Sequence, residues 1–69
     1  MSYEVEIKEV QESRNHTYFA LRLIAPNGNK SFLCRVDQDA VAASFIARAC
    51  EALANANEEL ASAFMDRSQ

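Results

Sequence analysis

The chain has 69 residues, of which 49% are hydrophobic and 25% charged, and it carries a formal net charge of −3. A chain of this length forms one domain, residues 1–69, and its hydrophobic content excludes an intrinsically disordered protein. No stretch is long enough to span a membrane, the acidic N-terminus is unlike a signal peptide, and the two cysteines and one histidine lack metal-ligand spacing. We therefore expect a cytoplasmic protein with free thiols, without metal or cofactor, and with oligomerisation reinforcing so small a fold.

Three segments in which apolar and polar residues alternate predict β-strands at about residues 3–9, 16–25 and 30–36. A polar run at residues 11–15 predicts the loop between the first two strands. The segment Pro26-Asn27-Gly28-Asn29 is typical of a tight hairpin turn between the second and third strands. A loop centred on Asn27 and Gly28 would pair residues of one apolar face: Leu23 with Phe32, Leu21 with Cys34 and Phe19 with Val36.

A continuous helical pattern follows the strands, from about residue 38 to residue 66, with Asp37 as the predicted N-cap. A helix of about 28 residues is roughly 42 Å long, whereas strands of about eight residues span roughly 27 Å. The predicted fold is therefore α+β (βββα): a three-stranded antiparallel β-meander followed by one long C-terminal α-helix that packs on one sheet face and extends beyond it. The predicted core draws on both layers: Val5, Ile7, Phe19, Leu21, Leu23, Phe32, Cys34 and Val36 from the strands, and Val41, Phe45, Ile46, Ala49 and Leu53 from the helix.

The apolar seam in the second half of the helix predicts a homodimer. Leu53, Asn57, Leu60 and Phe64 follow heptad spacing, and Asn57 is a polar member that would fix the register of two paired helices. Two alternatives remain open. The segment Asn55-Ala56-Asn57 is a weak break that would let a second short helix fold back on the first, or a foreign protein would cover the seam.

The sequence shows no residues with the spacing of a catalytic site. His16 has no set of converging catalytic partners nearby in the chain, and the neighbouring Glu58 and Glu59 point about 100° apart on a helix. We therefore expect no enzymatic activity. Candidate partner-binding residues lie instead on two surfaces: Tyr18, Arg22 and Arg35 on the outer sheet face, and Glu51, Glu58 and Glu59 on the acidic helix.

Three antiparallel strands followed by an alanine-rich helix resemble the later part of a double-stranded-RNA-binding domain, with a similar alanine pattern at residues 39–53. Where that family has a lysine cluster at the helix start, this chain has Asp37-Gln38-Asp39, whose carboxylates would repel RNA, so the RNA-binding function is not carried over. In its small size, acidity and lack of catalytic motifs the chain is similar to phage-encoded inhibitors of host machinery, including anti-CRISPR proteins. That resemblance implies stoichiometric binding to a host protein.

The sequence thus predicts a small, non-enzymatic, homodimeric protein-binding module, an inhibitor or adaptor that acts on a host protein with a basic surface. One alternative is a nucleic-acid-binding regulator that uses Tyr18, Arg22 and Arg35. Another is a structural subunit of a larger assembly. Binding to membranes is not expected.

Overall fold

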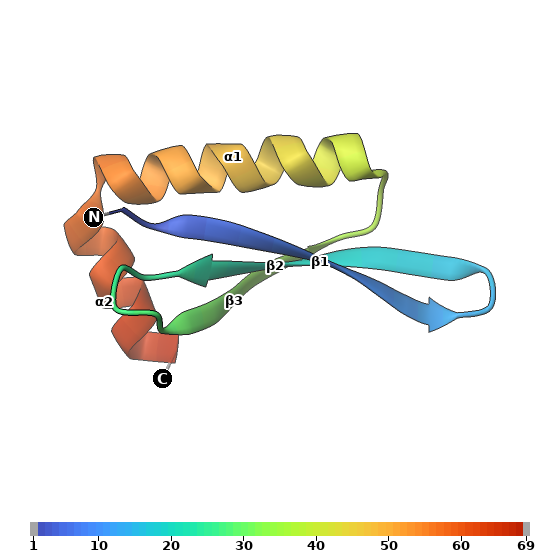
Figure 1. The fold of residues 1–69 in the computed structure, drawn as a ribbon, viewed down its shortest axis with the longest axis horizontal. Coiled ribbons are helices and arrows are strands. Elements are labelled where there is room, and N and C mark those ends of the chain that lie inside the picture. The colour runs from blue at the N-terminus through green and yellow to red at the C-terminus, as the bar shows by residue number, and fades with distance from the viewer. Residues whose placement is uncertain (1, 69) are drawn as a thin grey trace.

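The computed structural model describes residues 2–68, in which three strands precede two helices (Figure 1). The strands are β1 (Glu4–Ser13), β2 (His16–Ile24) and β3 (Lys30–Val36), and the helices are α1 (Ala40–Ala56) and α2 (Glu58–Ser68). The strands form one antiparallel sheet in the order β1-β2-β3. The predicted α+β class and antiparallel meander are confirmed, whereas the single long helix is wrong, because the structure has two helices in its place.

β1 is longer than the alternating pattern predicted, because it continues through polar residues to Ser13 and leaves only Arg14 and Asn15 as the turn. β3 pairs with β2 only from Phe19 onward. The tip of the β1–β2 hairpin is therefore a two-stranded ribbon that projects past the helices (Figure 1). A ribbon that no helix covers has no buried face, so its sequence lacks the alternation that identifies a half-buried strand.

The β2–β3 turn lies where it was predicted, and glycine provides its left-handed residue. Gly28 has φ 94°, whereas Asn27 keeps a negative φ. The N–H of Gly28 donates to the carbonyl of Ala25 (2.8 Å), and the N–H of Ala25 donates to the carbonyl of Asn29 (2.8 Å). This is the pattern of a three-residue hairpin loop whose last residue requires positive φ.

A β-bulge in β3 moves Phe32 out of the predicted core. The pairs Leu21–Cys34 and Phe19–Val36 are confirmed, but the register shifts after Leu21, so that Leu33 has no partner. Phe32 consequently lies opposite Arg22 on the outer face and is 57% exposed. The predicted Leu23–Phe32 pair is therefore wrong, because one extra residue reverses the faces of the strand.

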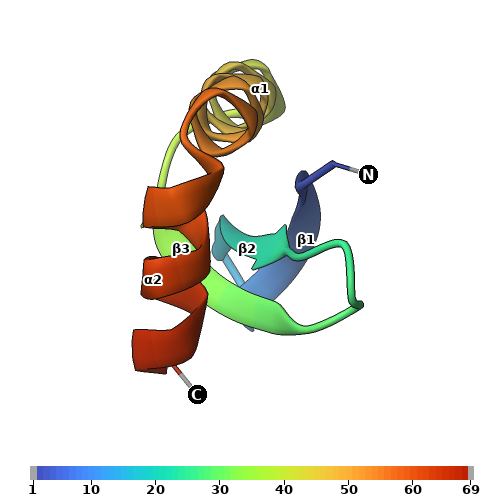
Figure 2. The same ribbon diagram turned by 90° about the vertical axis from the view of Figure 1, so that its left-hand side faces the viewer.

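The helical pattern breaks at Asn57, which has φ −135° and ψ 64°. The N–H of Asn57 still donates to the carbonyl of Leu53 (3.0 Å), and the N–H of Ala61 donates to that of Asn57 (3.0 Å). A single residue therefore makes the elbow, and α2 then runs beside β3 (Figure 2) and buries Ala61 and Met65. The break near Asn57 that the fold-back alternative required is present, but α2 packs beside the sheet and does not fold back along α1 (Figures 1 and 2). Turning at Asn57 buries apolar residues that a straight helix would carry past the end of the sheet.

The N-cap of α1 is Asp39. The prediction of Asp37 as the N-cap is therefore wrong. The Asp39 carboxylate accepts a hydrogen bond from the N–H of Ala42 (2.9 Å), which is the usual capping contact. Asp37 instead accepts hydrogen bonds from Arg35, so its carboxylate is engaged on the outer face of the sheet.

The core lies between the inner sheet face and the small residues of α1. The strands and their flanking residues contribute several buried apolar side chains, including Tyr3, Val5, Leu21, Leu23 and Val36. α1 contributes Ala43, Ala47 and Ala54, with the half-buried Ile46 and Cys50 beside them. The predicted helix face is therefore largely wrong, because α1 is turned so that Val41, Phe45, Ala49 and Leu53 are exposed.

Candidate protein-interaction surface

The polar residues of α1 form one stripe that faces the free edge of β1. Arg48, Glu51 and Asn55 are spaced three and four residues apart and therefore lie on one side of the helix. β1 is an edge strand, so its outward backbone groups have no neighbouring strand to pair with. The stripe supplies the missing partners.

The contacts between the stripe and the β1 edge are specific. The Asn55 amide accepts a hydrogen bond from the N–H of Tyr3 (2.7 Å) and donates to its carbonyl (3.0 Å), as a neighbouring peptide group would. The Glu51 carboxylate accepts from the N–H of Val5 (2.9 Å), and Arg48 donates to the carbonyl of Val5 (3.1 Å). Four edge groups are thereby satisfied, and this part of the edge is closed to a further strand.

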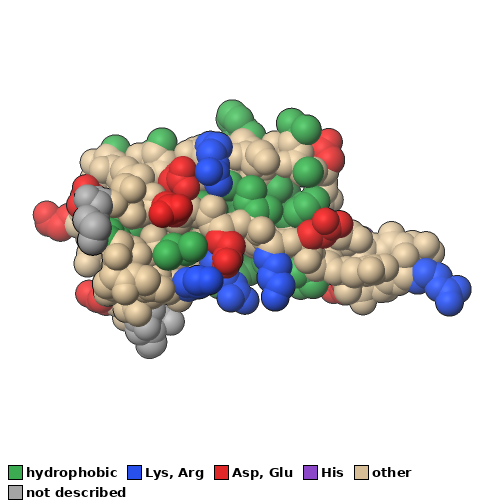
Figure 3. Space-filling model, in the orientation of Figure 1, with side chains coloured by type: hydrophobic (Ala, Val, Ile, Leu, Met, Phe, Trp, Pro, Cys, Tyr) green, Lys and Arg blue, Asp and Glu red, His purple; other side chains and the backbone are tan. Residues whose placement is uncertain are grey.

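The outward face of α1 consists of Val41, Phe45, Ala49, Ala52, Leu53 and Ala56, and all six are exposed. Val41 is 77% exposed, Phe45 is 74% exposed and Leu53 is 66% exposed. Hydrophobic side chains accordingly project from the outer side of α1 in the space-filling view (Figure 3). A helix that is apolar both toward its own sheet and away from it is normally buried on both sides, so this face is the main candidate interaction surface.

The predicted seam residues lie around the elbow between the two helices. Leu53, Asn57 and Leu60 line a groove of about 310 Å³ together with Ala54 and Ala61. Leu60 is 67% exposed, whereas Phe64 packs against the core and is half-buried. Because the helix turns at Asn57, these residues do not form a straight heptad seam. Leu53 and Leu60 instead extend the outward face of α1 toward α2.

Arg35 organises the outer face of the sheet. Its Nε donates to both carboxylate oxygens of Asp37 (2.9 and 2.8 Å), and its terminal nitrogens donate to Glu12 (3.4 and 3.2 Å). The guanidinium also lies over the Tyr18 ring, 3.9 Å from its centroid. The hydrogen bond from Arg35 holds the pKa of the Asp37 carboxyl below its ordinary value, and the hydrogen bonds to Asp37 and Glu12 raise the pKa of Arg35. Two of the predicted binding residues, Tyr18 and Arg35, are thus engaged with each other.

The fold places three charged side chains around His16, one from its own hairpin and two from the end of β3. Its Nε2 lies 3.1 Å from a carboxylate oxygen of Asp37, 3.5 Å from one of Glu12 and 3.2 Å from a terminal nitrogen of Arg35. The predicted Phe19–Val36 pair already brings the end of β3 beside the start of β2, so the strand register was the available signal. The side chains of His16, Glu12 and Asp37 are 44–50% exposed, where water screens charges strongly. We interpret the group as a surface ion-pair network.

The remaining predicted binding residues lie apart from one another. Arg22 is exposed on the outer sheet face, opposite Glu6 on β1. Glu58 and Glu59 are exposed in the first turn of α2, where their charge favours the helix dipole. Glu51 is occupied by the β1 edge and by Arg48 (3.4 Å), so it does not present a free carboxylate to a partner.

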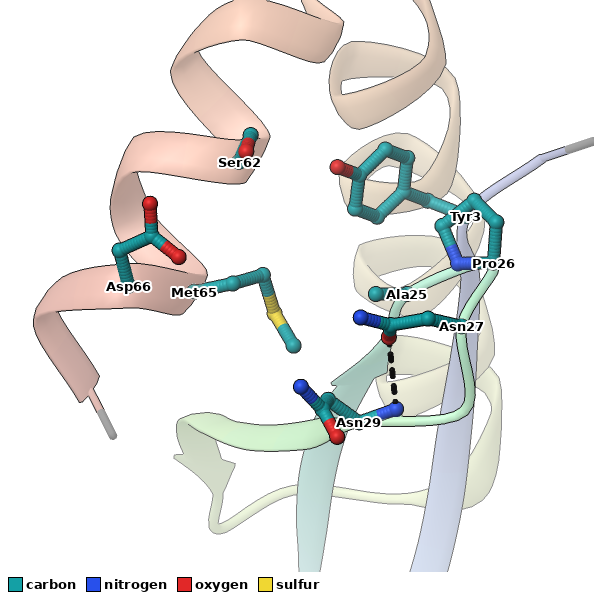
Figure 4. A pocket seen from close by; sticks show the side chains of 8 residues that line it. All are labelled: Tyr3, Ala25, Pro26, Asn27, Asn29, Ser62, Met65 and Asp66. Atoms are coloured by element: carbon teal, nitrogen blue, oxygen red, sulfur yellow. Dashed lines mark hydrogen bonds between the residues drawn. The ribbon is translucent and has the colours of Figure 1, made fainter.

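A pocket of about 270 Å³ lies where α2 meets the β2–β3 turn (Figure 4). Figure 4 shows Ser62, Met65 and Asp66 of α2 on one side, and Tyr3 with the turn residues on the other. The Asn27 side chain accepts a hydrogen bond from the N–H of Asn29 (3.0 Å) and so serves the turn itself. We interpret this pocket as the cleft left by the docking of α2.

Cysteine thiols and clustered acidic side chains are the remaining groups that could carry chemistry. Cys34 and Cys50 are free and half-buried, and burial raises the pKa of the Cys50 thiol. Among residues 2–68, no group of three or more His, Cys, Asp or Glu side chains is arranged to hold a metal ion. No helix in the described part of the chain is long and apolar enough to cross a membrane.

Comparison of the chain with protein-family models, with curated proteins and with solved structures found no significant match. The fold and the surfaces described above therefore provide the basis for a functional proposal.

Proposed function

We propose that the protein is a non-enzymatic protein-binding module that associates through the outward face of α1. The observation that carries this proposal is the exposure of Val41, Phe45 and Leu53 on a helix whose Arg48, Glu51 and Asn55 side chains hydrogen-bond to the edge of β1. Small proteins rarely leave such a contiguous apolar surface in water unless another protein covers it. A module of this kind acts stoichiometrically, as inhibitors, adaptors and structural subunits do.

The energetics favour a protein partner on this face. Burying a Val, Leu or Phe side chain contributes about 1.5–3 kcal/mol when the whole side chain leaves water. Val41, Phe45 and Leu53 are two-thirds exposed or more, so most of that contribution is still available to association. Aromatic residues at the centre of such a face are the usual energetic anchors, which makes Phe45 the residue on which binding depends most.

The outer sheet face is less suited to binding phosphates than the sequence suggested. The guanidinium of Arg35 is held by Asp37 and Glu12, and Lys30 donates to Glu6 (3.2 Å). A nucleic acid would have to displace these carboxylates before it gained either cation. The net charge of −3 also disfavours a polyanionic partner.

In-cell photocrosslinking from position 45 tests the proposed function. The full chain is expressed in its source cells with a photoreactive phenylalanine analogue in place of Phe45, and adducts are identified by mass spectrometry after irradiation. The matched control carries the same analogue in place of Phe32, which is also an exposed phenylalanine but lies on the outer sheet face. We expect protein adducts from position 45 and few from position 32.

Adducts from position 32 but not from position 45 would contradict the proposal and move the interface to the sheet. Absence of protein adducts from both positions would also contradict it. An adduct from position 45 to any protein, including a second copy of this chain, supports the proposed function.

A further inference from the structure

We propose that the pocket between α2 and the β2–β3 turn is a binding site for a small organic cation, that is, a guanidinium or alkylammonium group. The site goes beyond the proposed function, because none of its residues belongs to the outward face of α1. Three features support it: a buried tyrosine hydroxyl without a partner, a lining whose only ionised side chain is acidic, and hydrogen bonds that hold the lining in place.

The Tyr3 hydroxyl faces this pocket and lacks a partner. Tyr3 is only 7% exposed, and Figure 4 shows its hydroxyl pointing across the pocket toward Ser62. Within residues 2–68, the hydrogen bonds of Tyr3 are those of its backbone groups with Asn55, and none involves the hydroxyl. A buried tyrosine hydroxyl normally has a hydrogen-bond partner. This hydroxyl is therefore free to bind a ligand.

The charge of the lining selects a cation. Asp66 is the only side chain of the lining that is ionised at neutral pH, and it makes no hydrogen bond or ion pair within residues 2–68. It stands in the last turn of α2, where the helix dipole is negative. The neighbouring Arg67 lines a different groove, together with Leu60 and Phe64. An anion would therefore find no cation in this pocket to pair with.

The rest of the lining fits an organic cation better than a metal ion. Hydroxyl and amide oxygens come from Tyr3, Ser62, Asn27 and Asn29, and apolar contacts come from Ala25, Pro26 and Met65. Guanidinium and ammonium groups carry several N–H donors, which the carboxylate, hydroxyl and amide oxygens can accept, while the hydrocarbon part contacts the apolar wall. Within residues 2–68, no group of three or more His, Cys, Asp or Glu side chains is arranged to hold a metal ion.

The volume of the pocket limits the size of the ligand. It measures about 270 Å³, just below the range of about 300–1,000 Å³ that is typical of small-molecule sites. The pocket therefore suits one guanidinium or ammonium group with a short hydrocarbon chain. That group can come from a free metabolite or from an arginine or lysine side chain of another protein, and its chemistry is the same in both cases.

Local hydrogen bonds hold the lining in place before any ligand binds. The Asn55 amide binds both backbone groups of Tyr3 (2.7 and 3.0 Å). In the turn, the Asn27 side chain accepts from the N–H of Asn29 (3.0 Å), and the N–H of Ala25 donates to the carbonyl of Asn29 (2.8 Å). A site that is already ordered loses less conformational entropy on binding, so a small ligand can be held by few contacts.

NMR titration of the isotope-labelled full chain with ethylguanidinium tests the proposal. Ethylurea, which has nearly the same shape but no charge, is the matched control ligand. With ethylguanidinium we expect saturable shifts in the backbone amides of Ser62 and Asp66 and in the side-chain amides of Asn27 and Asn29. The expected dissociation constant is on the order of 1 mM. Ethylurea should cause no saturable shift.

Two variants assign the binding to the pocket. Asp66→Asn should weaken binding of ethylguanidinium several-fold, as expected for an ion pair at an exposed position. Glu58→Gln is the control, because it removes an equal charge from the other end of α2 and should leave the affinity unchanged. Tyr3→Phe removes only the hydroxyl and should also weaken binding. Circular dichroism should show that all three variants remain folded.

Absence of saturable shifts with ethylguanidinium would overturn the inference, as would equal shifts with ethylurea. It would also be overturned if Asp66→Asn weakened binding no more than Glu58→Gln. The source of the cation follows from two further ligands, free arginine and the capped peptide Gly-Arg-Gly. Tighter binding of the peptide supports a site for a protein side chain, and tighter binding of free arginine supports a site for a metabolite.

Discussion

At the scale of single residues, Asn55 performs the task of a neighbouring strand. Its amide pairs with both backbone groups of Tyr3 and also donates to the carbonyl of Glu51 (2.9 Å). A short amide side chain can do this because it carries the same donor and acceptor as a peptide group. One residue thereby joins α1 to the beginning of the sheet.

Asn55→Ala should lower the free energy of unfolding by about 1–3 kcal/mol, because half-buried backbone groups of Tyr3 lose their partners. Urea denaturation followed by circular dichroism measures the change. The control is Asn15→Ala, at an exposed turn position, which should change stability by no more than about 0.5 kcal/mol. Equal effects from the two variants would show that the edge contact contributes little.

The ion pair of Asp37 with Arg35 makes stability depend on pH in a defined direction. The pKa of Asp37 is lower in the folded protein than its ordinary value of 3.8, because Arg35 stabilises the carboxylate. The unfolded chain therefore binds the proton first as pH falls, so the contribution of Asp37 is complete above about pH 4 and is lost as pH falls through the folded-state value. Asp37→Asn removes this contribution.

The difference in unfolding free energy between wild type and Asp37→Asn should therefore shrink when the pH is lowered from neutrality to about 3. Chemical denaturation at several pH values measures it. A difference that stays constant over this interval would mean that the ion pair does not stabilise the folded state.

At the scale of elements, the strands were predictable and the orientation of α1 was not. The turn at Pro26-Asn27-Gly28-Asn29 and the alternating pattern located β3 and two of its pairs. For α1, hydrophobicity alone assigned the large residues to the core. In the structure, Arg48, Glu51 and Asn55 instead form hydrogen bonds with backbone groups at the edge of β1. The opposite face of α1, which carries the large apolar residues, therefore points outward. The spacing of these three polar residues was visible, but the unpaired edge that attracts them exists only in the folded sheet.

The candidate site was partly predictable for a related reason. Leu60 was assigned to an apolar seam and is exposed, whereas Leu53 was assigned both to that seam and to the core and is exposed. Val41 and Phe45 were missed, because they were assigned to the core. The bulge that exposes Phe32 also could not be recognised from the sequence, because the apolar and polar residues of β3 alternate as in a regular strand.

The docking of α2 on the sheet depends on Met65, which is buried against the core. Met65→Ala should lower the free energy of unfolding by about 2–5 kcal/mol, as large-to-small changes in cores do. Leu60→Ala is the control on the exposed side of α2 and should have a small effect. Both are measured in the Phe45→Glu background, so that association does not contribute. If Leu60→Ala is the more destabilising change, α2 does not pack as described.

At the scale of the whole molecule, the proposed association through the outward face of α1 depends on apolar contacts and not on charge. The chain carries a net charge of −3. Salt screens interactions between charges, whereas apolar contacts are not weakened by it. We therefore expect binding through this face to persist at high salt.

The yield of protein adducts from a photoreactive analogue at position 45 should be retained between about 20 mM and about 500 mM sodium chloride, over which the Debye length decreases severalfold. Irradiation of cell lysate adjusted to each salt concentration measures it. Binding that weakens steeply with salt would instead indicate association through ion pairs, and would contradict an apolar interface.

The most direct test of the account is the solvent accessibility of Phe45 in the assembled protein. All four phenylalanines are replaced by para-fluorophenylalanine, and fluorine NMR signals are recorded with a soluble paramagnetic reagent that broadens exposed groups. In an isolated chain Phe45 is more exposed than Phe32. The account predicts the reverse order in the assembled protein, with the Phe45 signal protected and the Phe32 signal broadened. A Phe45 signal that is broadened at least as strongly as that of Phe32 at every protein concentration would contradict it.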